Sequence, residues 1–306
     1  MTIILGTHRV LPPDDAVASG CGADWFRPSD HLPGRGVRLL PRGVQLAAAA
    51  VSGLPEEMLW ACPADRRGAW IVTSTFAERM QQEIDAEVLA SGSDGLSPLS
   101  APYFSVNLLG DRLVRDHRVK GMAVAITSPR TGLTDALAGA AHALALGRVD
   151  RAVIVCAEVD ADGSGRVREG AVALVLAAED DAPDTDAVVA RVTVDRGFLH
   201  GEDSPLRLGQ EASGAPSAGR SGHRHLVFSD RAQDNAALHR VIDLDGECVD
   251  AERSPLRRGS IDQAVALADL AEGPGGTLTT VAVAGEWSRI EISTLPGRPD
   301  ADGGRR

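Results

Sequence analysis

Four cysteines are the first residues to consider for nucleophilic or metal chemistry: Cys21, Cys62, Cys156 and Cys248. They lie far apart and form no CxxC pair, the spacing on which zinc ribbons and small disulfide frameworks depend. We therefore expect reduced thiols, no metal site and no cofactor. The sequence also contains no G-x-S-x-G elbow, which argues against a hydrolase.

Histidines are the next candidates, because imidazole serves both proton transfer and metal binding. His223 and His225 flank an arginine in a Gly-, Ser- and Pro-rich stretch without a third ligand, so a solvated pair is favoured over a zinc site. His142 falls in an alanine-rich helical pattern and is expected to pack or cap. The cluster at 200–203 (HGED) could act as an acid and base, but its loop setting indicates surface polarity.

Charge and hydropathy exclude two classes of partner. The formal net charge is −12 and Lys120 is the only lysine, whereas nucleic-acid binding needs clustered cations. No stretch approaches the roughly 18–20 apolar residues that a membrane span requires. We therefore expect a cytoplasmic protein that binds neither nucleic acid nor membrane.

The elements that would position a site follow an alternating α/β pattern. Apolar runs predict strands at 2–5, 69–74, 121–127, 151–157, 170–177, 187–194, 225–228 and 277–284, and helices at 43–52, 76–89, within 101–119, at 133–146, 232–242 and 260–270. In the helix at 76–89, Met80, Ile84 and Val88 share one face. The strands at 151–157, apart from Arg151, and at 170–177 are apolar, which indicates a sheet covered by helices on both faces.

Several segments occur in a familiar order: the opening MTIILG, 26–50 (FRPSDHLPGRGVRLLPRGVQLAAAA), 126–137 (ITSPRTGLTDAL), 144–158 (LALGRVDRAVIVCAE) and 169–176 (EGAVALVL). Together they resemble the ketosynthase branch of the thiolase fold. They are most similar to chain-length factors, the non-condensing partners of type II polyketide ketosynthases. The resemblance covers about residues 1–180 well and the remainder weakly.

The resemblance assigns a reactive cysteine to the start of the helix near Thr131, where ketosynthases read T-A-C-S-S-S-L-x-A-L. A helix N-terminus lowers a thiol pKa and stabilises negative charge. Counting from both ends of the segment places Arg130 at that position, and alignment on Gly132 places Pro129 there. Neither residue can carry a thioester. Arginine also opposes the helix dipole, so a counter-charge or solvent should compensate it.

The residues that would support the cysteine are missing as well. Condensing enzymes use two histidines for decarboxylation and charge stabilisation. The segment 226–234 (LVFSDRAQD) keeps only Asp234 of the first motif, and in 255–260 (PLRRGS) the second histidine is replaced by Ser260. In 281–292, Val283 stands for the gating phenylalanine and Trp287 for an asparagine. The resemblance therefore implies a subunit without catalytic residues of its own.

Family members dimerise through the strand before the nucleophile helix, and a helix upstream lines the acyl tunnel of the partner. The strand corresponds here to Gly121, Met122, Ala123, Val124, Ala125, Ile126 and Thr127. On the upstream helix within 102–114, the residues implied to limit the acyl chain are Tyr103, Phe104, Asn107, Leu108 and Asp111. A bulky or polar group at the tunnel end stops extension, because an added methylene gains roughly 0.8 kcal/mol only where space exists for it. Phe104 and Leu108 could equally be ordinary core residues.

The sequence thus predicts an α/β protein with a thiolase-like layered αβαβα fold of two related halves, the second one shortened. We expect an N-terminal ketosynthase-like half with the dimer interface at 1–180, a C-terminal half at 187–297 and a polar tail at 298–306.

As a function we expect a chain-length-factor-like subunit that forms a heterodimer with a catalytic ketosynthase and contacts an acyl carrier protein transiently. Two alternatives stay open. One is an acyltransferase-type enzyme that uses Ser128, Thr131 or Cys156 as its nucleophile. The other is a homodimeric scaffold that only binds acyl groups.

Overall fold

The computed structural model describes residues 1–13, 25–34, 36–76, 78–96, 105, 107–128, 130–161, 163, 167–181, 190–198, 224–229, 252–255, 259–273, 275–281 and 286–293. Its strands are β1 (Thr2–Val10), β2 (Arg67–Val72), β3 (Met122–Ile126), β4 (Arg151–Glu158), β5 (Gly170–Ala178), β6 (Ala190–Phe198), β7 (Arg224–Ser229), β8 (Glu252–Pro255), β9 (Gly276–Val281) and β10 (Glu286–Ser293). Its helices are α2 (Pro28–His31), α3 (Arg42–Ser52), α4 (Glu56–Leu59), α5 (Glu78–Ser91), α6 (Asn107–Asp116), α7 (Gly132–Ala145) and α9 (Ile261–Glu272). Short 3-10 turns are η2 (Val37–Leu39), η3 (Ala64–Arg66), η4 (Ser93–Gly95) and η6 (Glu179–Asp181).

All these strands form one sheet of ten strands, in the order β3-β2-β4-β5-β1-β6-β10-β9-β7-β8. From its outer edge to the centre of the sheet, the first half has the order β3-β2-β4-β5-β1, and the second half has the corresponding order β8-β7-β9-β10-β6. In each half the second strand lies parallel between the third and the fourth. The halves join where β1 pairs antiparallel with β6. The strand order itself therefore shows two related α/β halves with a pseudo-twofold relationship.

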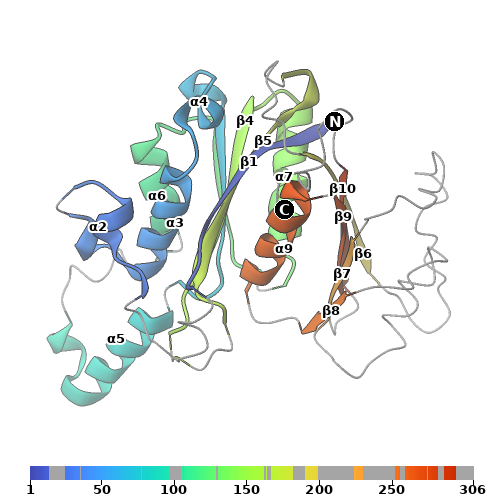
Figure 1. Ribbon diagram of the computed structural model, residues 1–306. Coiled ribbons are helices and arrows are strands. Elements are labelled where there is room, and N and C mark those ends of the chain that lie inside the picture. The colour runs from blue at the N-terminus through green and yellow to red at the C-terminus, as the bar shows by residue number, and fades with distance from the viewer. Residues whose placement is uncertain are drawn as a thin grey trace, which may run out of the picture.

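The helices form layers on this sheet (Figure 1). In the first half, α3 and α6 cover one face, and α7 covers the other. The two central helices, α7 and α9, contact strands of both halves and so lie between them. Between β6 and β8, only residues 224–229 belong to the described part of the chain.

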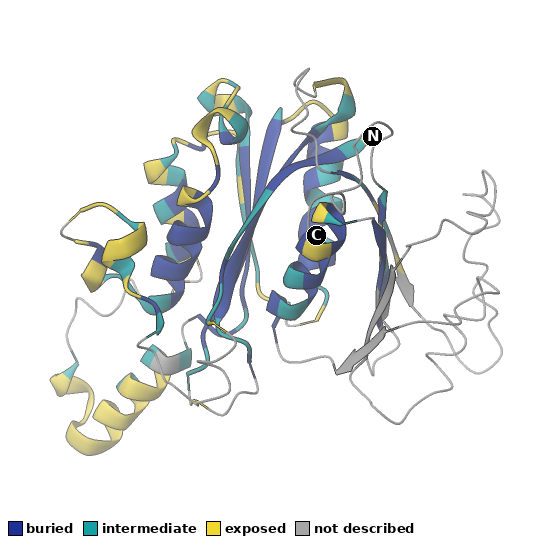
Figure 2. Ribbon diagram, in the orientation of Figure 1, coloured by how far each residue is buried: buried dark blue, intermediate teal, exposed yellow. Residues whose placement is uncertain are grey.

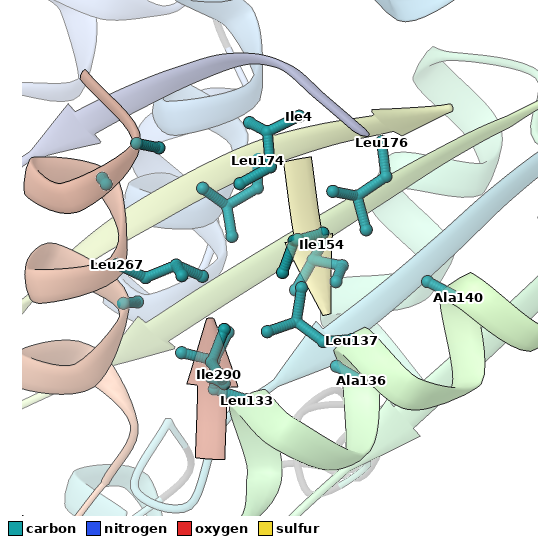
Figure 3. Packing of buried hydrophobic residues seen from close by; sticks show 14 of the residues in the cluster. Ile4, Leu133, Ala136, Leu137, Ala140, Ile154, Leu174, Leu176, Leu267 and Ile290 are labelled. Atoms are coloured by element: carbon teal, nitrogen blue, oxygen red, sulfur yellow. The ribbon is translucent and has the colours of Figure 1, made fainter. Parts of the chain in front are cut away.

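Two apolar clusters hold the layers together, and strand periodicity explains why there are two. Along β4, Ile154 points into the cluster shared with α7 and α9, while Val153 and Val155 point into the cluster under α3. Figure 3 shows Leu133 and Leu137 of α7 converging with the strand residues on the first of these. Small residues line the helix faces here, so helices and strands approach closely. A sheet packed on both faces forms a rigid base for a site at its edge.

Most of the predicted elements are confirmed, with one correction. The first strand does not end at Gly6 but continues to Val10 through an irregularity in its pairing with β5. The strands at 121–127 and 151–157 are parallel, and β2 lies between them and pairs with both. The predicted helix at 232–242 lies outside the described residues, and the proposed domain boundaries stay a prediction.

The helix α5 has little packing within the chain. The predicted face of Met80, Ile84 and Val88 is not buried, since Val88 is 38% exposed and the neighbouring Leu89 is 88% exposed. Figure 2 shows this helix as the exposed projection at the lower left. Helical spacing alone therefore did not identify a core face here.

Candidate functional site

Four segments meet at one edge of the first half: the ends of β2 and β4 and the starts of α7 and α9. Because β2, β3 and β4 are parallel, their carboxyl ends share this edge, the usual location of sites in α/β sheets. Gly132 shows how closely the two helix starts approach. A Cβ atom on Gly132 would lie 3.0 Å from Ser260 Oγ and 2.6 Å from Val72 Cγ1. Only glycine fits between these elements without displacing one of them.

The start of α7 carries hydroxyl groups and no thiol. Ser128 Oγ and Thr131 Oγ1 are 2.7 Å apart, and Thr131 Oγ1 donates to Asp135 Oδ2 at 2.8 Å. The other Asp135 oxygen accepts a hydrogen bond from Arg196 at 2.8 Å. The hydroxyl chain therefore ends on a carboxylate that is already neutralised by a guanidinium group.

Arg130 lies two residues before the start of α7 and is exposed. Its backbone carbonyl accepts a hydrogen bond from Gln263 Nε2 at 3.0 Å, which joins the start of α7 to the first turn of α9. Asp135 places a carboxylate in the first turn of α7, a favourable position near a helix N-terminus. Pro129, the alternative position for the lost nucleophile, lies outside the described residues.

Ser260, the predicted position of a lost histidine, is the residue before α9 and is fully buried. Its backbone N–H donates to Glu158 Oε1 at 3.2 Å. The preceding Gly259 has φ +97°, and a Cβ there would lie 2.8 Å from the Glu158 carboxyl group. Glycine is therefore required at 259 for both backbone conformation and space. The structure brings Ser260 and the start of α7 together.

Glu158 is the centre of this edge and has no cationic partner among the described residues. Its Oε2 accepts the backbone N–H of Ser74 at 2.9 Å and of Thr75 at 3.0 Å, together with the Thr75 hydroxyl at 2.7 Å. With the bond from Ser260, one side chain ties the ends of β2 and β4 to the second half of the molecule. Burial raises the pKa of the Glu158 carboxyl, and these hydrogen bonds oppose that rise.

Two buried polar atoms near the same point lack a hydrogen-bond partner within the described part of the chain: Ser260 Oγ and Gln263 Oε1. Both side chains are almost fully buried. A serine hydroxyl and an amide oxygen cannot relay protons as an imidazole does. The arrangement joins the starts of α7 and α9, and no imidazole is found among these side chains.

Cys156, one of the alternative nucleophiles, lies within β4 and is 1% exposed. Burial, together with the nearby Glu158 carboxylate, strongly raises the pKa of the Cys156 thiol. A thiol of this kind stays protonated and does not reach a substrate. Cys156 is a small apolar core residue.

The edge strand β3 is the predicted interface. It pairs with β2 on one side and lies at the end of the sheet on the other. Met122, Val124 and Ile126 pack partly against the core, whereas Ala123 is exposed. The strand carries no charge, proline or bulge, the devices that normally block edge pairing. Gly121 is required sterically, because a Cβ there would lie 2.6 Å from the Asp65 carbonyl oxygen.

The residues predicted to line a tunnel are only partly described. Tyr103 and Phe104 lie outside the described residues. Asn107 and Asp111 are exposed on α6, and Leu108 packs against the cluster under α3. Their position on the helix beside β3 agrees with the prediction but does not test a tunnel role.

Neither a metal cluster nor a membrane span is found in the described part of the chain. Within the described ranges, no group of three His, Cys, Asp or Glu side chains could hold a metal ion. No helix among them is long and apolar enough to cross a bilayer. His142 is exposed on α7, away from the α7 start.

Glu158 and Gln263 were missed as site residues by sequence reasoning. The sequence did contain a signal for Glu158, because it is an acidic residue at the end of a strand in which only the first residue, Arg151, is also polar. The three consecutive hydroxyl residues at 73–75 were a second signal. No feature of the sequence indicated that Gln263 would reach the backbone of Arg130.

No family model and no curated protein matches this sequence, but solved structures do. The chain is similar to AntDE:AntF, the type II polyketide synthase acyl-carrier protein in complex with its ketosynthase bound to the hexaketide. The TM-score is 0.71 at 14% identity, covering 96% of this chain and 99% of that chain. It is also similar to the ishigamide ketosynthase/chain length factor, with a TM-score of 0.67 at 15% identity and the same coverage. A β-ketoacyl synthase from Burkholderia phymatum STM815 gives a TM-score of 0.61 at 13% identity, again over 96% and 99%.

These likenesses establish the fold. The protein has a thiolase-like α/β fold of two related halves, and its structural neighbours are ketosynthases and ketosynthase/chain length factor proteins. At such identities the activity has to be inferred from the side chains at the edge of the sheet.

Proposed function

We propose that this protein is a non-catalytic, chain-length-factor-like subunit that pairs with a catalytic ketosynthase in type II polyketide or polyene chain elongation. The observation that carries the proposal is the composition of the two helix starts. Arg130 and Thr131 precede α7, and Ser260 precedes α9, so neither a nucleophilic thiol nor a catalytic imidazole is found there. Condensation would take place on the cysteine of the partner.

The edge strand β3 supports the pairing part of the proposal. An unpaired, uncharged edge strand offers backbone donors and acceptors to a second chain. Antiparallel pairing with the same strand of a ketosynthase would bring α6 next to the partner. The candidates that limit the length of the acyl chain are then Tyr103, Phe104, Asn107, Leu108 and Asp111. An acyl carrier protein would bind the resulting pair transiently.

The pairing is tested by co-expressing the chain with a candidate type II ketosynthase and measuring the mass of the complex by light scattering. We expect a stable pair of one copy of each chain. Ala123→Lys places a charge on the exposed face of β3 and should dissociate the pair without lowering thermal stability. Ala145→Lys, at an exposed alanine at the end of α7, is the matched control.

Separate elution of the two wild-type chains would contradict the proposal. A stable dimer of this chain alone, insensitive to the ketosynthase, would favour the homodimeric acyl-binding scaffold instead. Both results are obtained from the same measurement.

One observation favours a second candidate function. The hydrogen-bonded series Ser128, Thr131 and Asp135 places two hydroxyl groups at a helix N-terminus, where a covalent acyl ester could form. An acyltransferase of this kind would acquire an acyl group on Ser128 or Thr131. Peptide mass mapping after incubation with acyl-CoA locates such an ester, and Ser128→Ala with Thr131→Val should abolish it.

A further inference from the structure

The helix α5 and the turn η4 that follows it have no role in the site described above. Their segment, 78–94 (ERMQQEIDAEVLASGSD), contains five acidic residues and one arginine. From Gln81 to Ser91, every residue except Ile84 is exposed. Figure 2 shows the helix as a projection from the first half with an exposed surface. We refer to segment 78–94 as the acidic arm.

Packing within the chain does not explain why the acidic arm is helical. Among the described elements, the main neighbour of α5 is η4, the turn that directly follows it. A helix of 14 residues with few tertiary contacts is marginal in water, because most helical stability in proteins comes from packing. The last turn of α5 also carries no basic residue to offset the helix dipole. A partner that covers the arm would supply the missing contacts.

Leu89 marks the face of the acidic arm that a partner would cover. It is 88% exposed, more than any other large apolar residue in the described part of the chain. Asp85 lies one turn before Leu89 on the same face of the helix, and its carboxylate has no ion pair or hydrogen bond among the described residues. Val88, beside Leu89, is exposed as well. Apolar residues with a charged rim are the usual composition of a protein interface.

A second exposed segment of the same chain has the opposite charge. Segment 27–39 (RPSDHLPGRGVRL), which holds α2 and η2, contains three arginines and one aspartate. Arg27 and Arg38 are exposed, and within the described residues neither side chain forms an ion pair or a hydrogen bond. Leu39, next to Arg38, is 80% exposed and so provides an apolar contact between charges. We refer to segment 27–39 as the basic ridge.

The acidic arm and the basic ridge lie on the same side of the molecule. The helix α2 of the ridge packs against α3, which covers the face of the sheet opposite to α7. Figure 1 shows α2 and α5 on the side of α3, away from α9 and the second half. A twofold axis can therefore place the arm of each copy on the ridge of the other. The contact occurs twice and closes the pair, so it does not lead to an open chain of copies.

Charge complementarity identifies a second copy of this chain as the partner. The arm has a formal net charge of −4 and the ridge of +2, so the two attract each other across copies, whereas two arms repel. A helix with its side chains is about 10–12 Å across, close to the Debye length of about 8 Å at physiological salt. Carboxylates on every face of the arm therefore contribute to the attraction. Nucleic acids and anionic membranes are repelled by the arm.

We propose that the chain associates with a second copy of itself, with Asp85 and Leu89 of each acidic arm against Arg38 and Leu39 of the other copy's basic ridge. Each copy contributes two short segments, so the interface is small and the association is transient, increasing with protein concentration. The contact uses neither β3 nor the starts of α7 and α9. It requires no ketosynthase partner and no acyl group.

The test is sedimentation velocity of the full chain alone, over a range of concentrations at low salt. We expect reversible dimers that weaken at high salt, because salt screens exposed charges. An arm variant combines Asp85→Arg, Glu87→Arg and Asp94→Arg, and a ridge variant combines Arg27→Glu and Arg38→Glu. Each variant alone should self-associate at least about tenfold more weakly than the wild type. An equal mixture of the two should associate again, because each arm then meets a ridge of opposite charge.

Three single substitutions show which contact is measured, and thermal melting checks that every variant stays folded. Leu89→Ser removes an apolar contact and should weaken self-association by about tenfold. Leu146→Ser, at an exposed leucine outside both segments, is the matched control and should leave it unchanged. Ala123→Lys blocks pairing at β3 and should also leave it unchanged. Failure of this proposal is therefore distinguishable from failure of the proposed ketosynthase pairing.

Three results would overturn the proposal. The first is a chain that stays monomeric at low salt up to roughly 1 mM, the weak end of specific association. The second is self-association that survives either charge reversal or that is not restored in the mixture of the two variants. The third is self-association that Ala123→Lys abolishes and the charge reversals leave intact, which would make β3 the interface of a homodimer.

Discussion

Replacing Glu158 with glutamine removes one acceptor from the centre of the candidate site while keeping the shape of the side chain. The amide oxygen can take the place of Oε2 and keep its bonds from Ser74 and Thr75. The amide nitrogen then faces the backbone N–H of Ser260, which loses its acceptor. A buried donor without a partner costs about 1–3 kcal/mol, so Glu158→Gln should reduce the free energy of unfolding by that amount.

The loss of unfolding free energy in Glu158→Gln should depend on pH, and its direction follows from the pKa of Glu158. Burial raises the pKa of Glu158, so the folded state holds this proton more tightly than the unfolded state does. The stability due to Glu158 is then fully present below the unfolded pKa and is lost as pH rises through the folded pKa. The difference between wild type and Glu158→Gln should therefore narrow from acidic to alkaline pH, because glutamine does not titrate.

Urea unfolding followed by tryptophan fluorescence at several pH values measures this difference directly. Glu87→Gln, at an exposed carboxylate on α5, serves as the control and should change stability by less than about 0.5 kcal/mol. A Glu158→Gln variant as stable as the wild type, or a difference that widens toward alkaline pH, would refute the reasoning.

Three further predictions concern the same edge of the sheet. Gly132→Ala should lower the free energy of unfolding by about 1–3 kcal/mol in thermal unfolding, because the new Cβ would lie 2.6 Å from Val72 Cγ1. A Cβ at Gly36 would have nothing within 4 Å, so Gly36→Ala is the control and should be neutral. Similar losses of stability in both variants would be inconsistent with this packing. Ser260→Ala should leave stability unchanged or raise it by up to about 1 kcal/mol, since the hydroxyl is buried without a partner, and a clear loss in urea unfolding would show that a partner exists. Cys156 should resist thiol reagents in the native protein and react on unfolding, as followed by absorbance; rapid native labelling at Cys156 would contradict its burial.

The fold of the first half could be predicted from sequence because its elements are long and strongly patterned. The helix α7 and the strands β4 and β5 were each placed within one or two residues, since continuous apolar strands and an alanine-rich helix leave little ambiguity. The sheet order was not accessible in the same way. That β2 lies between β3 and β4 depends on long-range pairing, which local periodicity does not encode.

The candidate site was only half predictable. The absence of a thiol at the start of α7 follows directly from Arg130 and its neighbours in the sequence. The role of Glu158 depends on two distant backbone segments, at Ser74–Thr75 and at Ser260, that meet it only after folding. The orientation of Gln263 toward the Arg130 carbonyl likewise depends on how α9 packs beside α7. Sequence identifies the missing chemistry, whereas contacts across the two halves become visible only in the structure.

Arg118 illustrates the same limit for the opposite edge, because its backbone is left-handed, with φ at 51°. Its residue type and its neighbours in sequence gave no indication of a left-handed backbone, since the usual signal at such a helix end is glycine.

The central claim is that the chain itself does not carry the growing acyl group. The most direct measurement is intact mass spectrometry of both chains of a purified pair with a ketosynthase, after incubation with an acyl-loaded carrier protein. We predict an acyl adduct on the ketosynthase and an unmodified mass for this chain, with or without its partner. An acyl adduct on this chain, mapped to Ser128, Thr131 or any other residue, would contradict the claim.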